Sequence, residues 1–79
     1  MRDIYAEVGE HYDARGGNML SPMQTYRHKK TGGIYKIVTL GRNEADLRPI
    51  VIYRNVGEGH VWSRPVHEWL DGRFEIYRT

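Results

Sequence analysis

A chain of 79 residues with a net charge of +2 is long enough for one small domain. Because it has no cysteine, a disulfide scaffold, a cysteine-based zinc site and a thiol nucleophile are excluded. The pattern of a signal peptide is missing, and no apolar run approaches the length of a membrane span, so we expect a cytoplasmic protein that does not bind membranes.

The charges are unevenly distributed along the chain. Residues 1–18 carry two arginines against four acids, whereas residues 19–79 carry ten cations against six acids. The segment 25–42 has five cations and no acid, and nine of the chain's twelve cations are arginines. The arginine side chain suits phosphate, carboxylate and ring faces. A basic surface of this kind suggests an anionic partner, and the alternative is charge that only keeps the protein soluble.

Residues 1–24 are expected to form an extension ahead of the main domain. Four residues recur at helical spacing and predict a short helix over about residues 2–14: Ile4, Tyr5, Val8 and Tyr12. The glycine-containing segment 15–18 then indicates a helix stop and a flexible joint. This helix is expected either to pack on its own domain or to dock a partner or a second copy.

Residues 25–79 have the pattern of a β-domain. Runs rich in β-branched and aromatic residues predict five short strands, near residues 25–28, 34–40, 50–53, 60–64 and 74–77. Glycine-rich turns separate them, and Pro49 fits only the beginning or the edge of a strand. Pro65 is expected at the first position of a single helical turn within residues 65–70. This order predicts a mainly β fold, a five-stranded SH3-like barrel with a helical turn before the last strand.

Four ordered blocks carry a family resemblance: Tyr26-Arg27-His28-x-Lys30, Gly32-Gly33-x-Tyr35, Val51-x-Tyr53-Arg54 and Trp62-x-Arg64-Pro65. Together they resemble a small bacterial and phage domain of unknown function whose members look like SH3-type barrels. The resemblance covers about residues 24–77 and implies a fold but no settled activity. The chain departs from the pattern after the histidine, where two lysines and a threonine stand in place of a tyrosine, a lysine and a glycine.

An aromatic and basic cluster on or beside the predicted strands is the candidate ligand-binding site. Its members are Arg27, Lys29, Lys30, Tyr53, Arg54, Trp62 and Arg64. Alternation along a strand places Trp62 and Arg64 on one face. Bases stack on such rings for about 1–3 kcal/mol each, while arginines hold phosphates. A proline-rich or methylated-lysine peptide is an alternative ligand for the same rings.

A purely structural interpretation of this cluster stays open. In a barrel this small, Tyr35, Tyr53 and Trp62 are candidates for packing in the core or at an edge. Arg54 or Arg64 would then bond backbone carbonyls or a carboxylate such as Glu68 or Glu75.

Other chemistries find little support in the sequence. The four histidines show no pair at helical spacing, so we predict neither a metal site nor a cofactor, and His28 is expected to be packed or hydrogen-bonded. Neither serine lies in a nucleophile-elbow context, and the glycine turns match no phosphate-loop fingerprint. The chain is therefore predicted not to be an enzyme.

Two functions remain as expectations. The first is a non-enzymatic binding module with a basic, aromatic face for nucleic acid or a nucleotide. The second is a phage-type protein-interaction module, or a counter-defence inhibitor, that binds a host protein through Tyr5, Val8, Tyr12 and exposed rings. A homodimer is compatible with either function.

Overall fold

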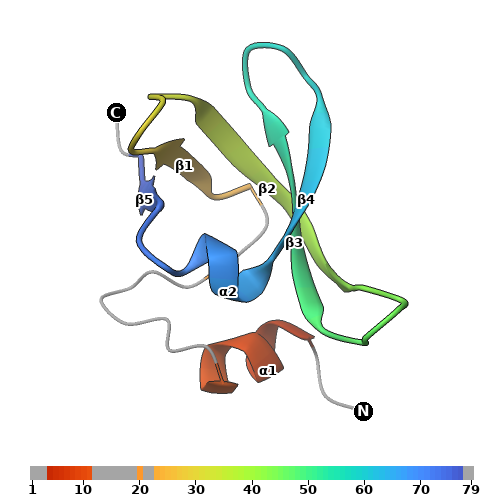
Figure 1. Ribbon diagram of the computed structural model, residues 1–79. Helices are drawn as coiled ribbons and strands as arrows, with labels where there is room; N and C mark the ends of the chain where they lie inside the picture. Colours follow the sequence, from red (N-terminus) through yellow and green to blue (C-terminus); the bar gives the residue numbers. More distant parts are fainter. Residues whose placement is uncertain (1–3, 12–19, 21–22, 78–79) are drawn as a thin grey trace.

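The computed structural model describes residues 4–11, 20 and 23–77 (Figure 1). Its elements in chain order are α1 (Ile4–His11), β1 (Thr25–His28), β2 (Ile34–Arg42), β3 (Pro49–Asn55), β4 (Val61–Pro65), α2 (Val66–Trp69) and β5 (Phe74–Ile76). Neither helix of the described residues is long and apolar enough to cross a membrane.

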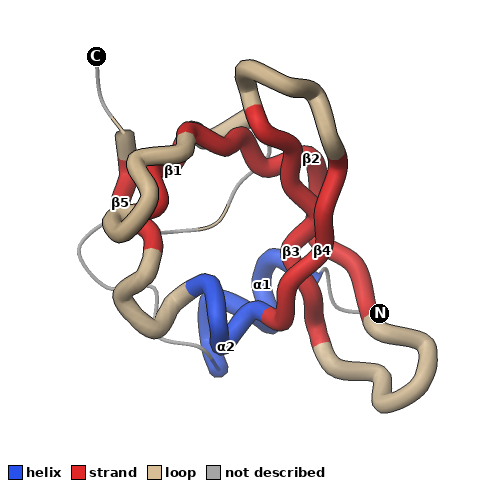
Figure 2. Tube along the Cα trace, turned by 45° about the horizontal axis from the view of Figure 1, so that its top comes forward, coloured by secondary structure: helices blue, strands red, loops and turns tan. Residues whose placement is uncertain are grey.

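The five strands form one antiparallel sheet in the order β4-β3-β2-β1-β5. In Figure 2 the sheet curls so that β1 and β5 face β3 and β4 across the interior, while α2 lies in the chain between β4 and β5. The prediction of a mainly β, barrel-like fold with five strands and a helical turn before the last one is therefore confirmed.

The two prolines at strand ends show how local chemistry sets the boundaries. Pro49 is the first residue of β3, as predicted from its missing N–H. Pro65 ends β4 instead of opening the helical turn, because its ψ of 142° is still extended. The turn therefore begins one residue later than expected, at Val66. Between Ile37 and Thr39 the register of β2 against β3 shifts, which leaves Val38 exposed.

The core is built around an aromatic stack. Trp69 of α2 lies parallel to Phe74 of β5, with ring centroids 3.8 Å apart, and Tyr26 meets the indole edge-on at 5.2 Å. The buried apolar residues around them are Val8, Leu20, Ile37, Leu40, Tyr53, Val51 and Val66. Burying one large apolar side chain stabilises a fold by about 1.5–3 kcal/mol, so this cluster supplies most of the driving force.

The helix α1 packs on its own domain. Val8 is buried among the core residues, Ile4 packs against them, and Glu7 forms an ion pair with Arg42 of β2. The helix was expected either to pack on its own domain or to dock a partner or a second copy, and at Val8 it packs on its own domain. The side chain of Tyr5, residue Tyr12 and the predicted joint at 15–18 lie outside what the structure describes.

Candidate functional site

Inward-facing rings from several strands meet on one side of the barrel. Phe74 is the centre, with His28 edge-on at 5.0 Å, Tyr35 at 5.9 Å and Tyr53 at 6.2 Å between ring centroids. Tyr53 is buried, whereas Tyr35 and His28 are half-buried. The interpretation of Tyr35 and Tyr53 as packing residues thus holds for both, because Tyr53 belongs to the core and Tyr35 packs against it. His28 is packed and hydrogen-bonded, as predicted.

Trp62 and Arg64 of β4 lie next to Tyr53 of this ring cluster. Trp62 stands opposite Tyr53 and Arg64 stands opposite Val51, and since both partners are buried, the two side chains share the inner face. The predicted shared face is therefore confirmed. Trp62 is nevertheless 53% exposed, because β4 is an edge strand. The His60 ring lies 6.1 Å from the indole.

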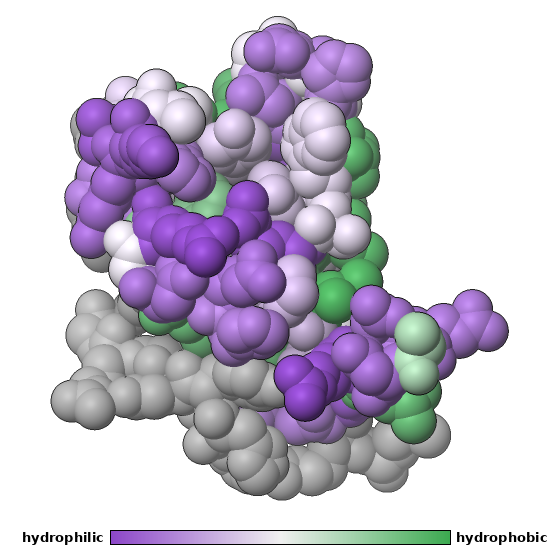
Figure 3. Space-filling view, in the orientation of Figure 1, coloured by the Kyte–Doolittle hydropathy of each residue, from purple (hydrophilic) through white to green (hydrophobic). Residues whose placement is uncertain are grey.

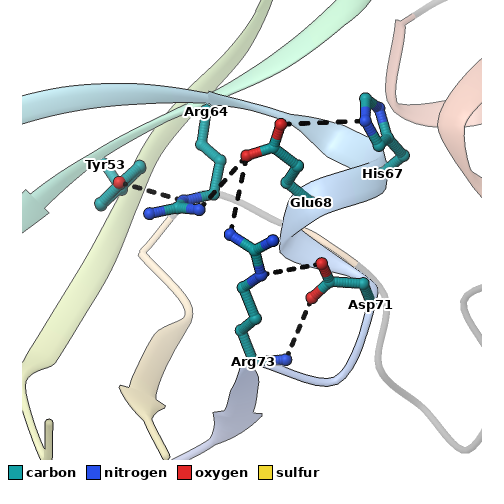
Figure 4. Close-up of polar contacts among 6 residues, drawn as sticks. All are labelled: Tyr53, Arg64, His67, Glu68, Asp71 and Arg73. Atoms are coloured by element: carbon teal, nitrogen blue, oxygen red, sulfur yellow. Dashed lines mark hydrogen bonds and ion pairs between the residues drawn. The ribbon is translucent and has the colours of Figure 1, made fainter. Parts of the chain in front are cut away.

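Arg64 is held in place by groups around it (Figure 4). Its Nη1 lies 3.4 Å from Glu68 Oε1, its Nε lies 3.5 Å from the Tyr53 hydroxyl, and its guanidinium sits 5.6 Å above the Phe74 ring. The carboxylate contact expected for the structural interpretation of Arg64 is therefore present. Only a quarter of the side chain is exposed, so Arg64 offers limited surface to a ligand.

Glu68 links Arg64 to a second arginine. Its Oε1 also lies 3.7 Å from Nη1 of Arg73, and Asp71 Oδ2 lies 2.9 Å from Nε of the same arginine (Figure 4). Surface ion pairs of this kind stabilise a fold by about 0–1 kcal/mol each. Their main effect here is positional, because two carboxylates hold the Arg73 guanidinium on the side of the ring cluster.

A basic pocket lies beside these arginines. It has a volume of about 390 Å³ and is lined by His28, Lys29, Lys30 and Arg73. On the face of the molecule drawn in Figure 3, hydrophilic side chains surround a small apolar patch. Lys29 and Lys30 are exposed, and neither has a carboxylate partner among the residues that the structure describes.

The turn between β1 and β2 shapes one wall of the pocket. Gly32 has a φ of +78°, which glycine adopts at no steric cost, and its N–H donates to the His28 carbonyl at 2.8 Å. Gly33 is needed for a different reason. A Cβ there would lie 2.9 Å from the Tyr35 ring. The predicted glycine turn is thus present. It positions Lys29 and Lys30 at the pocket, and Gly33 leaves room for the Tyr35 ring.

Residues 24–75 match the sequence profile of a family described as a protein of unknown function, DUF1653. The chain belongs to this family. The match runs from just before β1 into β5, and so covers nearly all of the sheet and the whole pocket. No curated protein and no solved structure matches the chain.

The seven predicted site residues of this DUF1653 domain fall into three groups. Lys29 and Lys30 line the pocket, whereas Tyr53, Trp62 and Arg64 belong to the ring cluster on the inner face. Arg27 and Arg54 each follow a buried tyrosine and therefore point to the outer face of the sheet. Arg27 forms an ion pair with Glu75 at 2.7 Å, and Arg54 stands opposite Lys36 and Val61.

Sequence reasoning left two pocket residues out of the predicted site: His28, expected only to be packed or hydrogen-bonded, and Arg73. The sequence context of Arg73, a cation after an Asp-Gly turn, is unremarkable, and only the tertiary structure places it against the β1–β2 turn. In the described ranges 4–11, 20 and 23–77, no three His, Cys, Asp or Glu side chains lie close enough together to hold a metal ion.

Proposed function

We propose that this DUF1653 domain is a non-enzymatic binding module that takes a nucleic acid or a nucleotide on the side of the barrel formed by the pocket and Trp62. One observation carries the proposal: a single carboxylate, Glu68, contacts both Arg64, which shares the inner face of β4 with Trp62, and Arg73, which lines the basic pocket. Rings and unpaired cations side by side are what a polynucleotide or nucleotide needs.

The charges and rings have separate tasks in this proposal. Lys29 and Lys30 attract phosphates, because no carboxylate of the described residues neutralises them. Trp62 offers a stacking platform that is worth about 1–3 kcal/mol for each base. Arg27 and Arg54 lie on the opposite face of the sheet, and the proposal therefore no longer relies on them.

A fluorescent single-stranded oligonucleotide tests the polynucleotide form of the proposal. Fluorescence anisotropy at about 50 mM and about 200 mM salt is expected to show binding that weakens steeply as salt rises, because phosphate contacts release counterions. Trp62→Ala is expected to weaken binding by about tenfold, the loss of one stacked base. Val61→Ala is the matched control, since Val61 is also exposed on the same strand but faces the other side.

Two results would count against this form of the proposal: no binding at the lower salt concentration, or equal affinity of the two variants. The nucleotide form is tested separately with a thermal-shift screen of nucleotides, because a ligand that binds only the folded state raises the melting temperature.

A protein-interaction module is the second candidate function, and the edge strand β4 favours it. The hydrogen bond from Asn55 N–H to the His60 carbonyl fixes the ladder, so that the N–H and C=O groups of Val61 and Ser63 point away from β3. Val61 and Trp62 are 62% and 53% exposed on this edge. Exposed apolar edges of this kind accept an added strand from a partner.

This second candidate changes the interface that the sequence suggested. Val8 is buried in the core and offers no surface to a partner, so β4 replaces the helix as the proposed contact. A partner that remains stoichiometric after nuclease treatment, and that is lost with Ser63→Pro but kept with Ser63→Ala, supports strand addition. A partner retained by both variants contradicts it. The narrower version, a phage inhibitor of a host protein, rests on the family resemblance alone.

A further inference from the structure

The geometry points to a phosphate monoester site in the pocket lined by His28, Lys29, Lys30 and Arg73. The site would take the terminal phosphate of a nucleotide or of a nucleic-acid strand, in preference to an internal phosphodiester. This inference deepens the proposed function and rests on it for the identity of the natural ligand. The pocket's affinity for phosphate itself is measurable without that assumption.

The charge of the pocket matches that of a monoester. Lys29 and Lys30 contribute two positive charges without a carboxylate partner in the described part of the chain, while the charge of Arg73 is offset by Asp71. A phosphate monoester carries about −1.5 to −2 at neutral pH, whereas an internal diester carries one negative charge. Two uncompensated cations are therefore best matched by the monoester.

The guanidinium of Arg73 is already in position. Asp71 Oδ2 lies 2.9 Å from its Nε, and Glu68 Oε1 lies 3.7 Å from its Nη1, while the side chain stays 47% exposed. The remaining N–H groups are free to donate to a phosphate oxygen, and a guanidinium is suited to bidentate contact. Because the two carboxylates already hold the arginine, less entropy is lost when a ligand binds.

His28 adds a hydrogen-bond donor to the three cations. Its Nδ1 accepts a hydrogen bond from the Thr31 N–H at 3.4 Å, so the neutral ring carries its proton on Nε2. The ring is also packed edge-on against Phe74, which fixes its plane. A histidine held in this tautomer can donate to a phosphate oxygen, and the position of the donor does not depend on a flexible stem as it does for the lysines.

The backbone fixes the two walls of the pocket relative to each other. The Lys29 N–H donates to the Arg73 carbonyl at 2.9 Å, and the Gly32 N–H donates to the His28 carbonyl at 2.8 Å. Gly33 N–H donates to Thr31 Oγ1 at 3.2 Å, which closes the turn. The pocket is thus formed before a ligand arrives.

The first experiment uses inorganic phosphate as the probe. In a ¹H–¹⁵N NMR titration at constant ionic strength and a pH of about 7.5, the backbone amides of Lys29, Gly32 and Arg73 are expected to shift and to saturate. The double variant Lys29→Gln/Lys30→Gln is expected to bind at least about tenfold more weakly. Lys36→Gln is the control, because Lys36 lies outside the pocket. Shifts that do not saturate, or that match those caused by chloride, overturn the site.

The second experiment compares oligonucleotides with and without a terminal phosphate. The phosphorylated strand is expected to bind at least about fivefold more tightly, and the double lysine variant is expected to remove the difference. If neither strand binds while inorganic phosphate does, the polynucleotide form of the proposed function is wrong and the pocket stands. If both strands bind equally and phosphate alone leaves the three amides unshifted, the pocket assignment is wrong and the proposed function stands.

Discussion

The backbone N–H of Lys29 donates a hydrogen bond of 2.9 Å to the carbonyl of Arg73. The bond joins the turn after β1 to the turn before β5, two segments that lie far apart in the sequence. Because β1 and β5 are neighbours in the sheet, the antiparallel pair continues through this bond into the turns. The basic pocket is therefore a consequence of the strand order and needs no separate element to build it.

The two tryptophans are expected to differ sharply in their effect on stability. Trp69 is 1% exposed and stacks on Phe74, so Trp69→Ala should cost about 3–5 kcal/mol, a large part of the stability of a small domain. Trp62 is 53% exposed, so Trp62→Ala should cost less than about 1 kcal/mol. Urea denaturation measures both. A larger loss for Trp62→Ala than for Trp69→Ala contradicts the assignment of the core.

The glycine before β2 is expected to be needed for ring packing. In Gly33→Ala the new Cβ would meet the Tyr35 ring at 2.9 Å, and the ring is itself packed against Tyr53 and Phe74. We expect a loss of about 1–2 kcal/mol, or a melting temperature lower by about 4–15 °C. Gly57→Ala is the control, because its nearest contact is at 3.4 Å. Equal melting temperatures for the two variants would show that Tyr35 moves aside freely.

Alkaline pH is expected to destabilise the fold through Tyr26. Burial raises the pKa of the Tyr26 hydroxyl to about 12, and contact with Trp69 lowers it only in part. The folded-state pKa lies above the unfolded value of 10.0, so the protonated phenol favours the folded state. This contribution is complete below a pH of about 10 and is lost as the pH rises through about 12.

Thermal melts across this pH range measure the effect of Tyr26. Tyr26→Phe keeps the ring and removes the titrating group, so its stability should fall less steeply than that of the wild type between pH values of about 10 and 12. Parallel curves for the two proteins would rule out Tyr26 as a source of the alkaline instability.

Glu68 is expected to restrain anion binding more than it stabilises the fold. Glu68→Gln removes the ion pairs with Arg64 and Arg73, each worth about 0–1 kcal/mol at this partly exposed position. Asp71 still holds Arg73 in the variant. The extra positive charge should therefore tighten oligonucleotide binding by a few-fold at low salt and leave the melting temperature almost unchanged. A weaker affinity at low salt would mean that Glu68 is required to position the two arginines.

Much of the fold follows from local sequence signals. The strand starts at Thr25 and Ile34, the proline at the beginning of β3 and the positive φ of Gly32 each depend on a few neighbouring residues, and the structure has them where expected. The boundary at Pro65 differs by one residue, because a proline ring fixes φ but leaves ψ free to stay extended.

Less of the candidate site than of the fold could be predicted from the sequence. Alternation shows that Tyr53 and Arg54 lie on opposite faces, but it does not show which ring belongs to the core and which to an edge. Tyr53 is buried and Trp62 is exposed only because β4 ends the sheet order. The meeting of Arg73 with Lys29 likewise depends on the pairing of the first and last strands, a long-range feature that no local pattern contains.

The pocket and Trp62 are proposed to act together as one anion-binding surface. The most direct test of this proposal is fluorescence anisotropy of a 5′-phosphorylated single-stranded oligonucleotide with four proteins, the wild type, Lys29→Gln/Lys30→Gln, Trp62→Ala and Lys36→Gln. We expect salt-dependent binding that weakens by at least about tenfold in the double lysine variant and in Trp62→Ala, and that is nearly unchanged in Lys36→Gln. Absence of binding by the wild type at low salt, or equal affinity of all four proteins, would contradict the proposal.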